Sequence, residues 1–225
     1  MYLPSHFAEQ RPDVLHKLIH DHPLGLLITL AGADADAGAS AGLQANPVPF
    51  FLDADPAGGP GILRAHVARA NPLWREARAD VEALVVFQGA QAYVSPNWYP
   101  AKAEHGKVVP TWNYVTVQAR GALRAIDDAQ WLRAFVARLT QHHEATLPKP
   151  WAVTDAPPEY IDSMLRAIVG IEIVLSSLVG KWKVSQNRSV ADRTGVVRGL
   201  RGREDSPTTS NTMADWVGSS IAPTT

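Results

Sequence analysis

Apolar residues in the first two thirds of the chain fall mostly in short runs, separated by segments rich in glycine, proline and polar residues. Runs of four to eight apolar residues bounded by turn-forming residues are typical of β-strands. We therefore expect strands at 24–30, 43–52, 62–67, 82–87, 91–94, 111–126 and 168–175.

Glycine and proline refine this picture of the strands. Gln88-Gly89-Ala90 separates two apolar runs and predicts a hairpin turn. Gly121 interrupts the longest run, where we expect a β-bulge. Pro47 and Pro49 cannot donate ladder hydrogen bonds, so the run that contains them belongs at a sheet edge, a bulge or a rim. The Gly/Ala/Asp-rich segment 31–41 predicts a loose hairpin loop, and 95–110 predicts an irregular loop.

Helical periodicity is confined to a few segments. The clearest one, 127–144, carries an apolar stripe at helical spacing, and Asp127 or Asp128 can cap its start. Ser189-x-x-Asp192 matches a capping box, which predicts a helix from there to Leu200. Shorter helices are expected at 11–22, 71–77 and 159–167, with a linker at 148–158.

The expected fold class is mainly β, a β-barrel with peripheral helices, because connections of the hairpin type outnumber helical crossovers. A chain of 225 residues suits one domain with a small appendage. We assign that domain to residues 1–203. The composition after Gly202 is rich in Ser, Thr, Gly and Pro, so we expect 204–225 to be a loosely held tail.

Composition excludes several classes of chemistry. The chain has no cysteine, so it has no disulfide, no cysteine-bound metal and no thiol nucleophile. No segment resembles an export signal or a membrane span, and we expect a cytoplasmic protein. No catalytic triad or carboxylate pair stands out, so no catalytic residue is assigned.

The net charge of −1 hides an uneven distribution. Residues 181–203 contain seven basic residues and one acidic residue, a net charge of +6. Lys181 and Lys183 alternate within an extended segment and precede a capped helix, whose N-terminus favours an anion. The segment is therefore either a phosphate site or a solvated basic surface. Arg64, His66 and Arg69 offer the same two interpretations, a phosphate site or surface salt bridges.

Aromatic residues cluster in two further segments. Trp98 and Tyr99 lie in the proline-containing loop 95–100, and Trp112 lies in 109–114. Such side chains can stack on a planar ligand, plug the end of a barrel or bury themselves in a subunit interface. His16, His20 and His22 form one more cluster, which we interpret as a solvated helix face rather than a metal site.

Five segments, in the same order along the chain, resemble the PaiB family of bacterial transcriptional regulators. They are MYLPSHF at 1–7, HVARANP at 66–72, YVSPNWY at 93–99, VPTWNY at 109–114 and GKWKVSQN at 180–187. Two positions depart from the family pattern. Ala45-Asn46-Pro47-Val48-Pro49 stands where the family often has Ala-x-His-x-Pro, so Pro47 replaces a histidine, and Gly89 is followed by Ala90 rather than by proline.

The resemblance implies a split β-barrel similar to flavin reductases and pyridoxamine-phosphate oxidases. It further implies a homodimer that binds FMN at the subunit interface and acts as a negative transcriptional regulator. A flavin needs a flat apolar slot, polar contacts at the ring edge and cations for its phosphate. On that basis the residues expected to bind FMN are His66, Arg69, Asn71, Ser95, Trp98, Tyr99, Thr111, Trp112, Asn113, Lys181, Lys183, Gln186 and Asn187.

Three functions remain open at this point. The chain is an FMN-binding regulator, a flavin-dependent oxidoreductase, or a flavin-binding dimer without catalysis, so whether it is an enzyme is not decided. No helix-turn-helix pattern is recognisable. The helix from Ser189 to Leu200, followed by Arg201 and Arg203, is the one segment suited to contact DNA.

Overall fold

The structure is a computed structural model that describes residues 1–32, 42–203 and 207–221. These residues belong to two compact units. Unit 1 comprises Met1–Leu18, Phe87–Val117 and Val179–Thr225, and unit 2 comprises Ile19–Val86 and Gln118–Leu178. Among the described residues, no helix is both long and apolar enough to cross a membrane. The expected hairpin loop at 31–41 lies almost entirely outside the described residues, and the expected domain boundary at residue 203 stays a prediction.

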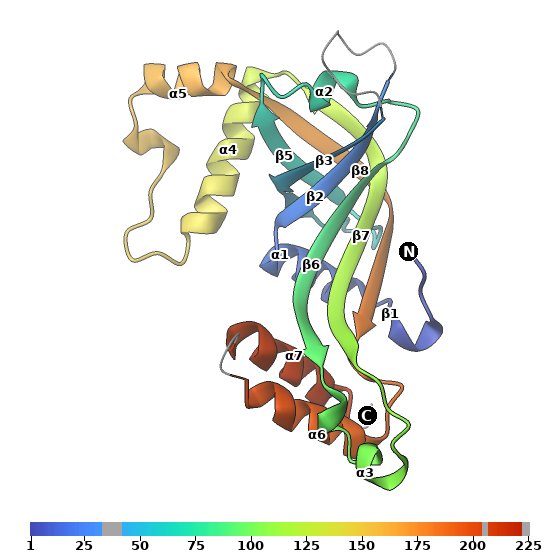
Figure 1. Ribbon diagram of the computed structural model, residues 1–225. Helices are drawn as coiled ribbons and strands as arrows, with labels where there is room; N and C mark the ends of the chain where they lie inside the picture. Colours follow the sequence, from blue (N-terminus) through green and yellow to red (C-terminus); the bar gives the residue numbers. More distant parts are fainter. Residues whose placement is uncertain (33–41, 204–206, 222–225) are drawn as a thin grey trace. The chain divides into compact units, whose positions relative to one another are not determined.

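Eight strands form one mainly antiparallel sheet, which confirms the predicted mainly β class (Figure 1). The strands are β1 Ala8–Glu9, β2 Leu24–Ala31, β3 Gly42–Pro49, β4 Phe51–Asp53, β5 Ile62–Ala68, β6 Ala83–Val94, β7 Thr111–Ile126 and β8 Ile168–Lys183. Their order is β3-β2-β6-β7-β8-β5-β4, with β1 paired to β8. The order ends at β3 and β4, so the described strands form a barrel that is not closed.

The edge position of β3 follows from its prolines. β3 pairs along its whole length with β2, and it is the last strand in the sheet order. Pro47 and Pro49 have no N–H to offer a further neighbour, so they are tolerated here and would disrupt a central strand. The predicted edge placement of these prolines is therefore confirmed.

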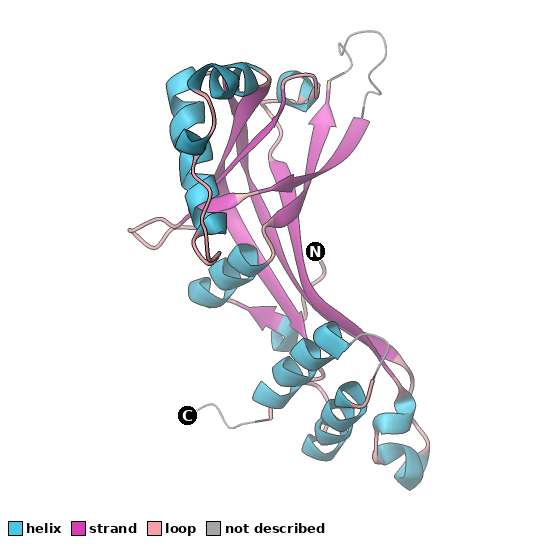
Figure 2. Ribbon diagram, turned by 90° about the vertical axis from the view of Figure 1, so that its left-hand side faces the viewer, coloured by secondary structure: helices cyan, strands magenta, loops and turns pink. Residues whose placement is uncertain are grey.

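Helices lie around the sheet, and they include all the helices expected from the sequence (Figure 2). The α-helices are α1 Pro12–Asp21, α2 Leu73–Glu76, α3 Ala101–His105, α4 Ala129–Glu144, α5 Pro158–Arg166, α6 Val190–Arg201 and α7 Pro207–Ser219. Three short 3₁₀ helices are η1 Ser5–Phe7, η2 Pro96–Trp98 and η3 Val153–Asp155. Asp128 caps α4 by accepting from the Trp131 amide at 2.6 Å, and Ser189 caps α6 by accepting from the Asp192 amide at 3.1 Å.

Two glycine-based expectations were wrong. The segment around Gly89 is not a turn, because β6 continues without a break from Ala83 to Val94. The buried face of β6 instead changes phase between Phe87 and Ala90, as an extra residue in a strand would cause. Gly121 does not mark a bulge, since burial alternates regularly through it. A Cβ on Gly121 would lie 2.1 Å from the Val174 carbonyl oxygen, so glycine permits close backbone approach there.

The predicted irregular tail was also wrong for residues 207–219, which form α7. Met213, Ala214 and Val217 are fully buried at helical spacing, and Ser210 is buried on the same side. α7 packs against α6, where Val196 and Leu200 are fully buried. The apolar stripe of α7 is short and surrounded by Ser and Thr, so composition concealed it.

Charged side chains form a network in the sheet of unit 2. Glu172 of β8 is 2% exposed and accepts from Nε of Arg64 and Nε of Arg124, each at 2.8 Å. Arg64 also pairs with Asp53, which accepts from Arg138 of α4 at 2.8 Å. Burial alone raises the pKa of Glu172, but the hydrogen bonds and charges of its two arginines hold that pKa below the ordinary value. The network therefore ties β4, β5, β7, β8 and α4 together through ionised groups.

The substitution Glu172→Gln should lower the free energy of unfolding by about 2–4 kcal/mol at neutral pH, because Arg64 and Arg124 lose the charge of their buried acceptor. Urea denaturation followed by tryptophan fluorescence measures the change. Glu159→Gln, at an exposed position of α5, is the matched control and should change stability by less than about 0.5 kcal/mol.

The pH dependence of this difference has a definite sign. The folded pKa of Glu172 lies below its ordinary value of 4.5, so the stabilisation by Glu172 is fully present above that value and disappears as the pH falls through the folded pKa. The difference in free energy of unfolding between the wild type and Glu172→Gln should therefore be smaller at about pH 3 than at neutral pH. A gap of equal size at both pH values would contradict the assignment of the ionised form.

Candidate functional site

The residues expected to bind a cofactor fall in both units. His66, Arg69 and Asn71 lie in unit 2. The remaining ten lie in unit 1: Ser95, Trp98, Tyr99, Thr111, Trp112, Asn113, Lys181, Lys183, Gln186 and Asn187.

The two lysines flank the aromatic ring of Tyr114 at the end of β8. Nζ of Lys183 donates to Oγ1 of Thr111 and to the carbonyl oxygen of Trp112, both at 2.6 Å. Nζ of Lys181 donates to the carbonyl oxygen of Tyr2 at 3.0 Å. The Tyr114 ring centroid is 5.4 Å from Nζ of Lys181 and 6.0 Å from Nζ of Lys183. Alternation along β8 and pairing with β7 thus gather two cations over one ring.

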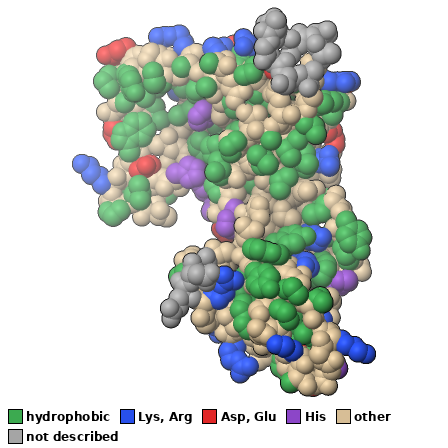
Figure 3. Space-filling model, in the orientation of Figure 1, with side chains coloured by type: hydrophobic (Ala, Val, Ile, Leu, Met, Phe, Trp, Pro, Cys, Tyr) green, Lys and Arg blue, Asp and Glu red, His purple; other side chains and the backbone are tan. Residues whose placement is uncertain are grey.

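This cluster of positive charge has no acidic counterpart. Among residues 1–32, 42–203 and 207–221, no carboxylate forms an ion pair with Lys181, Lys183 or Arg188. Burial is the first cause that lowers the pKa of Lys183; the charges of Lys181 and Arg188 lower it further, and Tyr114 opposes them. An anion beside these side chains would relieve the repulsion. In Figure 3, blue Lys and Arg side chains lie among hydrophobic ones over the part of the surface formed by α3, α6 and α7.

Unit 1 contains buried polar atoms without a hydrogen-bond partner in the described chain, among them Oδ1 of Asn113, next to Trp112, and Nε1 of Trp182, between the two lysines. The amide of Asn113 donates to Oγ of Ser185 at 2.9 Å, and Ser185 has a left-handed backbone with φ of 66°. Unpaired buried polar groups and strained backbone are both unfavourable, and both concentrate at functional sites.

Gln186 and Asn187 take different places from those expected for direct cofactor ligands. Oε1 of Gln186 accepts from the Val184 amide at 2.8 Å, and its Nε2 donates to the Trp182 carbonyl oxygen at 2.5 Å. Gln186 therefore closes its own turn after β8. Asn187 is exposed. Sequence analysis did not select Tyr114 or Arg188, although Tyr114 alternates with Trp112 on β7 and Arg188 directly follows the GKWKVSQN segment.

The aromatic loop packs against α6 of the same unit. Ser95 begins η2 by accepting from the Asn97 amide at 3.2 Å. The Trp98 ring lies over Gly199, where an added Cβ would be 2.2 Å from it. Tyr99 is 2% exposed, with the Arg188 guanidinium 5.0 Å from its ring centroid. The loop therefore holds the fold together, and both of its aromatic side chains contact their own chain.

Trp112 differs from these two aromatic residues because it is 54% exposed. Its ring lies edge-on to Tyr93, with 6.1 Å between the centroids, and Tyr93 is also exposed. This exposure excludes Trp112 from the hydrophobic core of the described chain. A large exposed aromatic pair is suited to cover a ligand or a second subunit.

The three residues of unit 2 are occupied in different ways. Oδ1 of Asn71 accepts from the Leu73 amide at 3.0 Å at the start of α2, and its Nδ2 donates to Oδ1 of Asn46 at 3.3 Å. Burial lowers the pKa of the His66 imidazole, and its Nδ1 has no hydrogen-bond partner. A half-buried imidazole whose pKa is lowered is suited to a hydrogen bond rather than to ion pairing.

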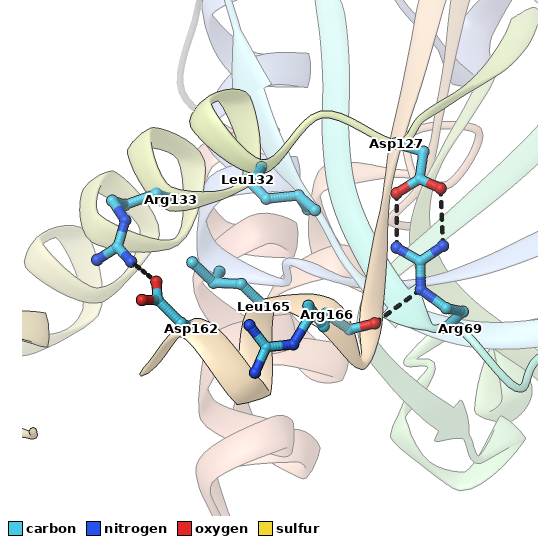
Figure 4. Close-up of a pocket in the computed structure, with 8 residues that line it drawn as sticks. Arg69, Asp127, Leu132, Arg133, Asp162, Leu165 and Arg166 are labelled. Carbon is cyan, nitrogen blue, oxygen red and sulfur yellow. Dashed lines mark hydrogen bonds and ion pairs between the residues drawn. The ribbon is translucent and has the colours of Figure 1, made fainter. Parts of the chain in front are cut away.

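Arg69 acts as a clamp between segments of unit 2 (Figure 4). Its guanidinium makes a bidentate pair with Asp127, at 2.7 and 2.5 Å. It also donates to the carbonyl oxygens of Arg166 at 2.7 Å and Ile168 at 3.0 Å. Four of its five N–H donors are thereby engaged, so a phosphate would find a single N–H unless it displaced one of these partners.

Comparison with known proteins adds independent information. Residues 1–177 match the model of a family described as "Putative FMN-binding domain". An uncharacterized protein of Emericella nidulans is 35% identical over 233 residues, which cover 89% of this chain and 90% of that protein. Protease synthase and sporulation protein PAI 2 of Bacillus subtilis is 26% identical over 206 residues, which cover 91% of each chain.

A solved structure shares the fold. The FAD and heme binding protein of Mycobacterium smegmatis superposes with a TM-score of 0.51 at 14% identity, covering 78% of this chain and 73% of that chain. At this level of identity the likeness concerns the fold alone. It confirms the split-barrel expectation, with the sheet left open between β3 and β4.

The contact between Trp98 and α6 predicts opposite effects for glycines in neighbouring helices. Gly195→Ala and Gly199→Ala should each lower stability, because the new Cβ would lie 2.0 Å from the Trp98 carbonyl oxygen or 2.2 Å from its ring. Gly218→Ala in α7 meets nothing within 4 Å and should raise stability by about 0.5–1 kcal/mol through helix propensity. Thermal unfolding of the three variants checks these signs, and stabilisation by Gly199→Ala would refute the packing role of Trp98.

Proposed function

The chain belongs to the FMN-binding domain family, and we propose that it acts as a flavin-binding negative transcriptional regulator of the PaiB type, with the flavin at a homodimer interface. The regulatory part of this proposal is supported by the Bacillus relative, which is named for protease synthesis and sporulation and aligns over 91% of both chains. The proposal that the chain binds a flavin is supported by its family and by the positive charge of Lys181, Lys183 and Arg188 in unit 1.

The single observation that carries the placement of the cofactor is the cluster of Lys181, Lys183 and Arg188, which forms no ion pair with a carboxylate in the described parts of the chain. A phosphate monoester carries close to two negative charges and accepts several hydrogen bonds. Lys181 and Lys183 would hold the FMN phosphate, and the Thr111 hydroxyl, already bonded to Lys183, would lie beside it. Binding would also offset the repulsion that contributes to lowering the pKa of Lys183.

Trp112 and Tyr93 supply the apolar surface that the flavin ring requires. Exposure of this pair in a single chain is explained if a second copy and the ring cover it together. Asn113, with its unpaired Oδ1, is the candidate for a polar contact at the ring edge. When bound, FMN would supply one- and two-electron redox chemistry.

The expected role of Lys183 can be tested by separating phosphate binding from ring binding. Lys183→Gln should weaken FMN binding at least about tenfold, because a charge-assisted contact to the phosphate is lost. Affinity for riboflavin, which has no phosphate, should change little. Titration followed by quenching of flavin fluorescence measures both constants. Lys107→Gln, at an exposed lysine in the loop before β7, is the control.

Equal weakening of FMN and riboflavin by Lys183→Gln would contradict the phosphate assignment and indicate a structural role. Lys183→Arg keeps the charge and should retain most of the affinity for FMN. Sedimentation of the flavin-loaded protein should give the mass of a dimer. A flavin-loaded monomer would overturn the placement at a subunit interface while leaving flavin binding intact.

Regulation through direct DNA contact would use the exposed side of α6. Its other side is buried through Val196 and Leu200, which leaves Arg198 and Arg201 exposed, the latter paired with Asp215 at 3.1 Å. Selection from a random duplex library should enrich a sequence whose binding weakens with salt. Arg198→Gln should weaken that binding severalfold, and Arg120→Gln, an exposed arginine of β7, should not.

The oxidoreductase alternative gives a different outcome in the same preparation. Consumption of NAD(P)H by the flavin-loaded protein, together with no enrichment of any DNA sequence, would overturn direct regulation and favour catalysis.

A further inference from the structure

A pocket lies in unit 2, between the beginning of α4, the end of α5 and Arg69 (Figure 4). It encloses about 230 Å³. Its lining residues are Arg69, Asp127, Ala129, Leu132, Arg133, Asp162, Leu165 and Arg166. Pockets for drug-sized ligands span roughly 300–1,000 Å³, so this one suits a smaller molecule than FMN.

Charges around the pocket cancel except for one guanidinium. Arg69 is paired with Asp127, and Arg133 is paired with Asp162. Arg166 forms no ion pair with any carboxylate in the described parts of the chain. Three arginines against two aspartates leave a net charge of +1 at this pocket. The pocket therefore favours a ligand with a single negative charge.

The unpaired arginine is held in place by its neighbour. Nε of Arg69 donates to the Arg166 carbonyl oxygen at 2.7 Å, which fixes the backbone at the end of α5 (Figure 4). Because Arg69 is itself bound to Asp127 through two hydrogen bonds, this attachment is rigid. The Arg166 side chain is exposed and keeps its donors available.

Leucines supply an apolar wall beside these charges. Leu132 of α4 and Leu165 of α5 are buried and form one cluster with Ile161. Figure 4 shows both leucines between the Arg133–Asp162 pair and the Arg69–Asp127 pair. An inorganic anion would use the guanidinium alone, whereas an organic anion would also bury apolar surface against the leucines.

We infer that this pocket binds a small organic monoanion, a carboxylate with a short apolar body, at a site separate from the flavin. The carboxylate would accept a charge-assisted hydrogen-bonded pair from Arg166, and the apolar body would lie against Leu132 and Leu165. The inference does not depend on the position of the flavin, because every residue that carries it lies in unit 2.

Benzoate serves as the probe, titrated by calorimetry into the purified full-length protein with and without saturating FMN. Arg166→Gln should weaken benzoate binding at least about tenfold. Asp162→Asn should strengthen it about threefold or more, since Arg133 is released and the local charge becomes more positive. Arg120→Gln is the matched control and should leave binding unchanged. Benzamide, the neutral analogue, should bind far more weakly than benzoate.

Four results would overturn the inference. Inorganic phosphate binding as tightly as benzoate would show an anion site without an apolar component. Competition between benzoate and FMN would assign the pocket to the flavin site. Weakening by both Arg166→Gln and Asp162→Asn would indicate a structural effect rather than a charge effect. Unchanged binding in Arg166→Gln would remove Arg166 from the site. Because benzoate is titrated with and without FMN, failure of flavin binding is distinguished from failure of this pocket.

Discussion

The ion pairs of Glu172 with Arg64 and Arg124 are the interaction on which the sheet of unit 2 depends. A carboxylate that is 2% exposed remains ionised only because two guanidinium groups donate to it. The same strand, β8, carries Lys181 and Lys183 further along, where no carboxylate of the described chain compensates them. β8 thus carries Glu172, whose neutralised charge stabilises the fold. It also carries two lysines that lack an ion pair in the described chain and are suited to bind an anionic ligand.

Close packing explains how unit 1 keeps its lysines in place. Gly195 and Gly199 remove side-chain volume from one face of α6, which lets η2 and Trp98 lie directly against the helix. The N-cap of α6, Ser189, lies only six residues beyond Lys183, so the position of α6 restricts the turn that follows β8. Gln186 closes that turn through two hydrogen bonds to its own backbone. Gln186, one of the residues expected to bind FMN, therefore stabilises the turn that follows Lys183.

Local patterns predicted most of the elements, because capping residues and apolar periodicity act within a few positions. Asp128, Ser189 and the edge prolines of β3 all behave as their local chemistry requires. The turn predicted at Gly89 and the bulge predicted at Gly121 were wrong because glycine occurs in turns, in bulges and at close backbone contacts alike. Only the segment that packs against the glycine distinguishes these roles. Lys181 and Lys183 could be selected from alternation alone. The pairing of Arg69 with Asp127, 58 residues away, could not, since it depends on long-range folding.

The lowered pKa of Lys183 affects the reactivity of its amine. A lysine nucleophile must be neutral, and a lowered pKa increases the neutral fraction at a given pH. The side chain is half-buried yet reaches Thr111 and the Trp112 carbonyl at the exposed end of β7. An amine-directed acylating reagent would therefore modify Lys183 more readily than its burial suggests. A bound phosphate would raise the pKa of the amine, favour its protonated form and so protect it from the reagent. The side chain would in this way serve as a built-in chemical reporter of whether its anion is present.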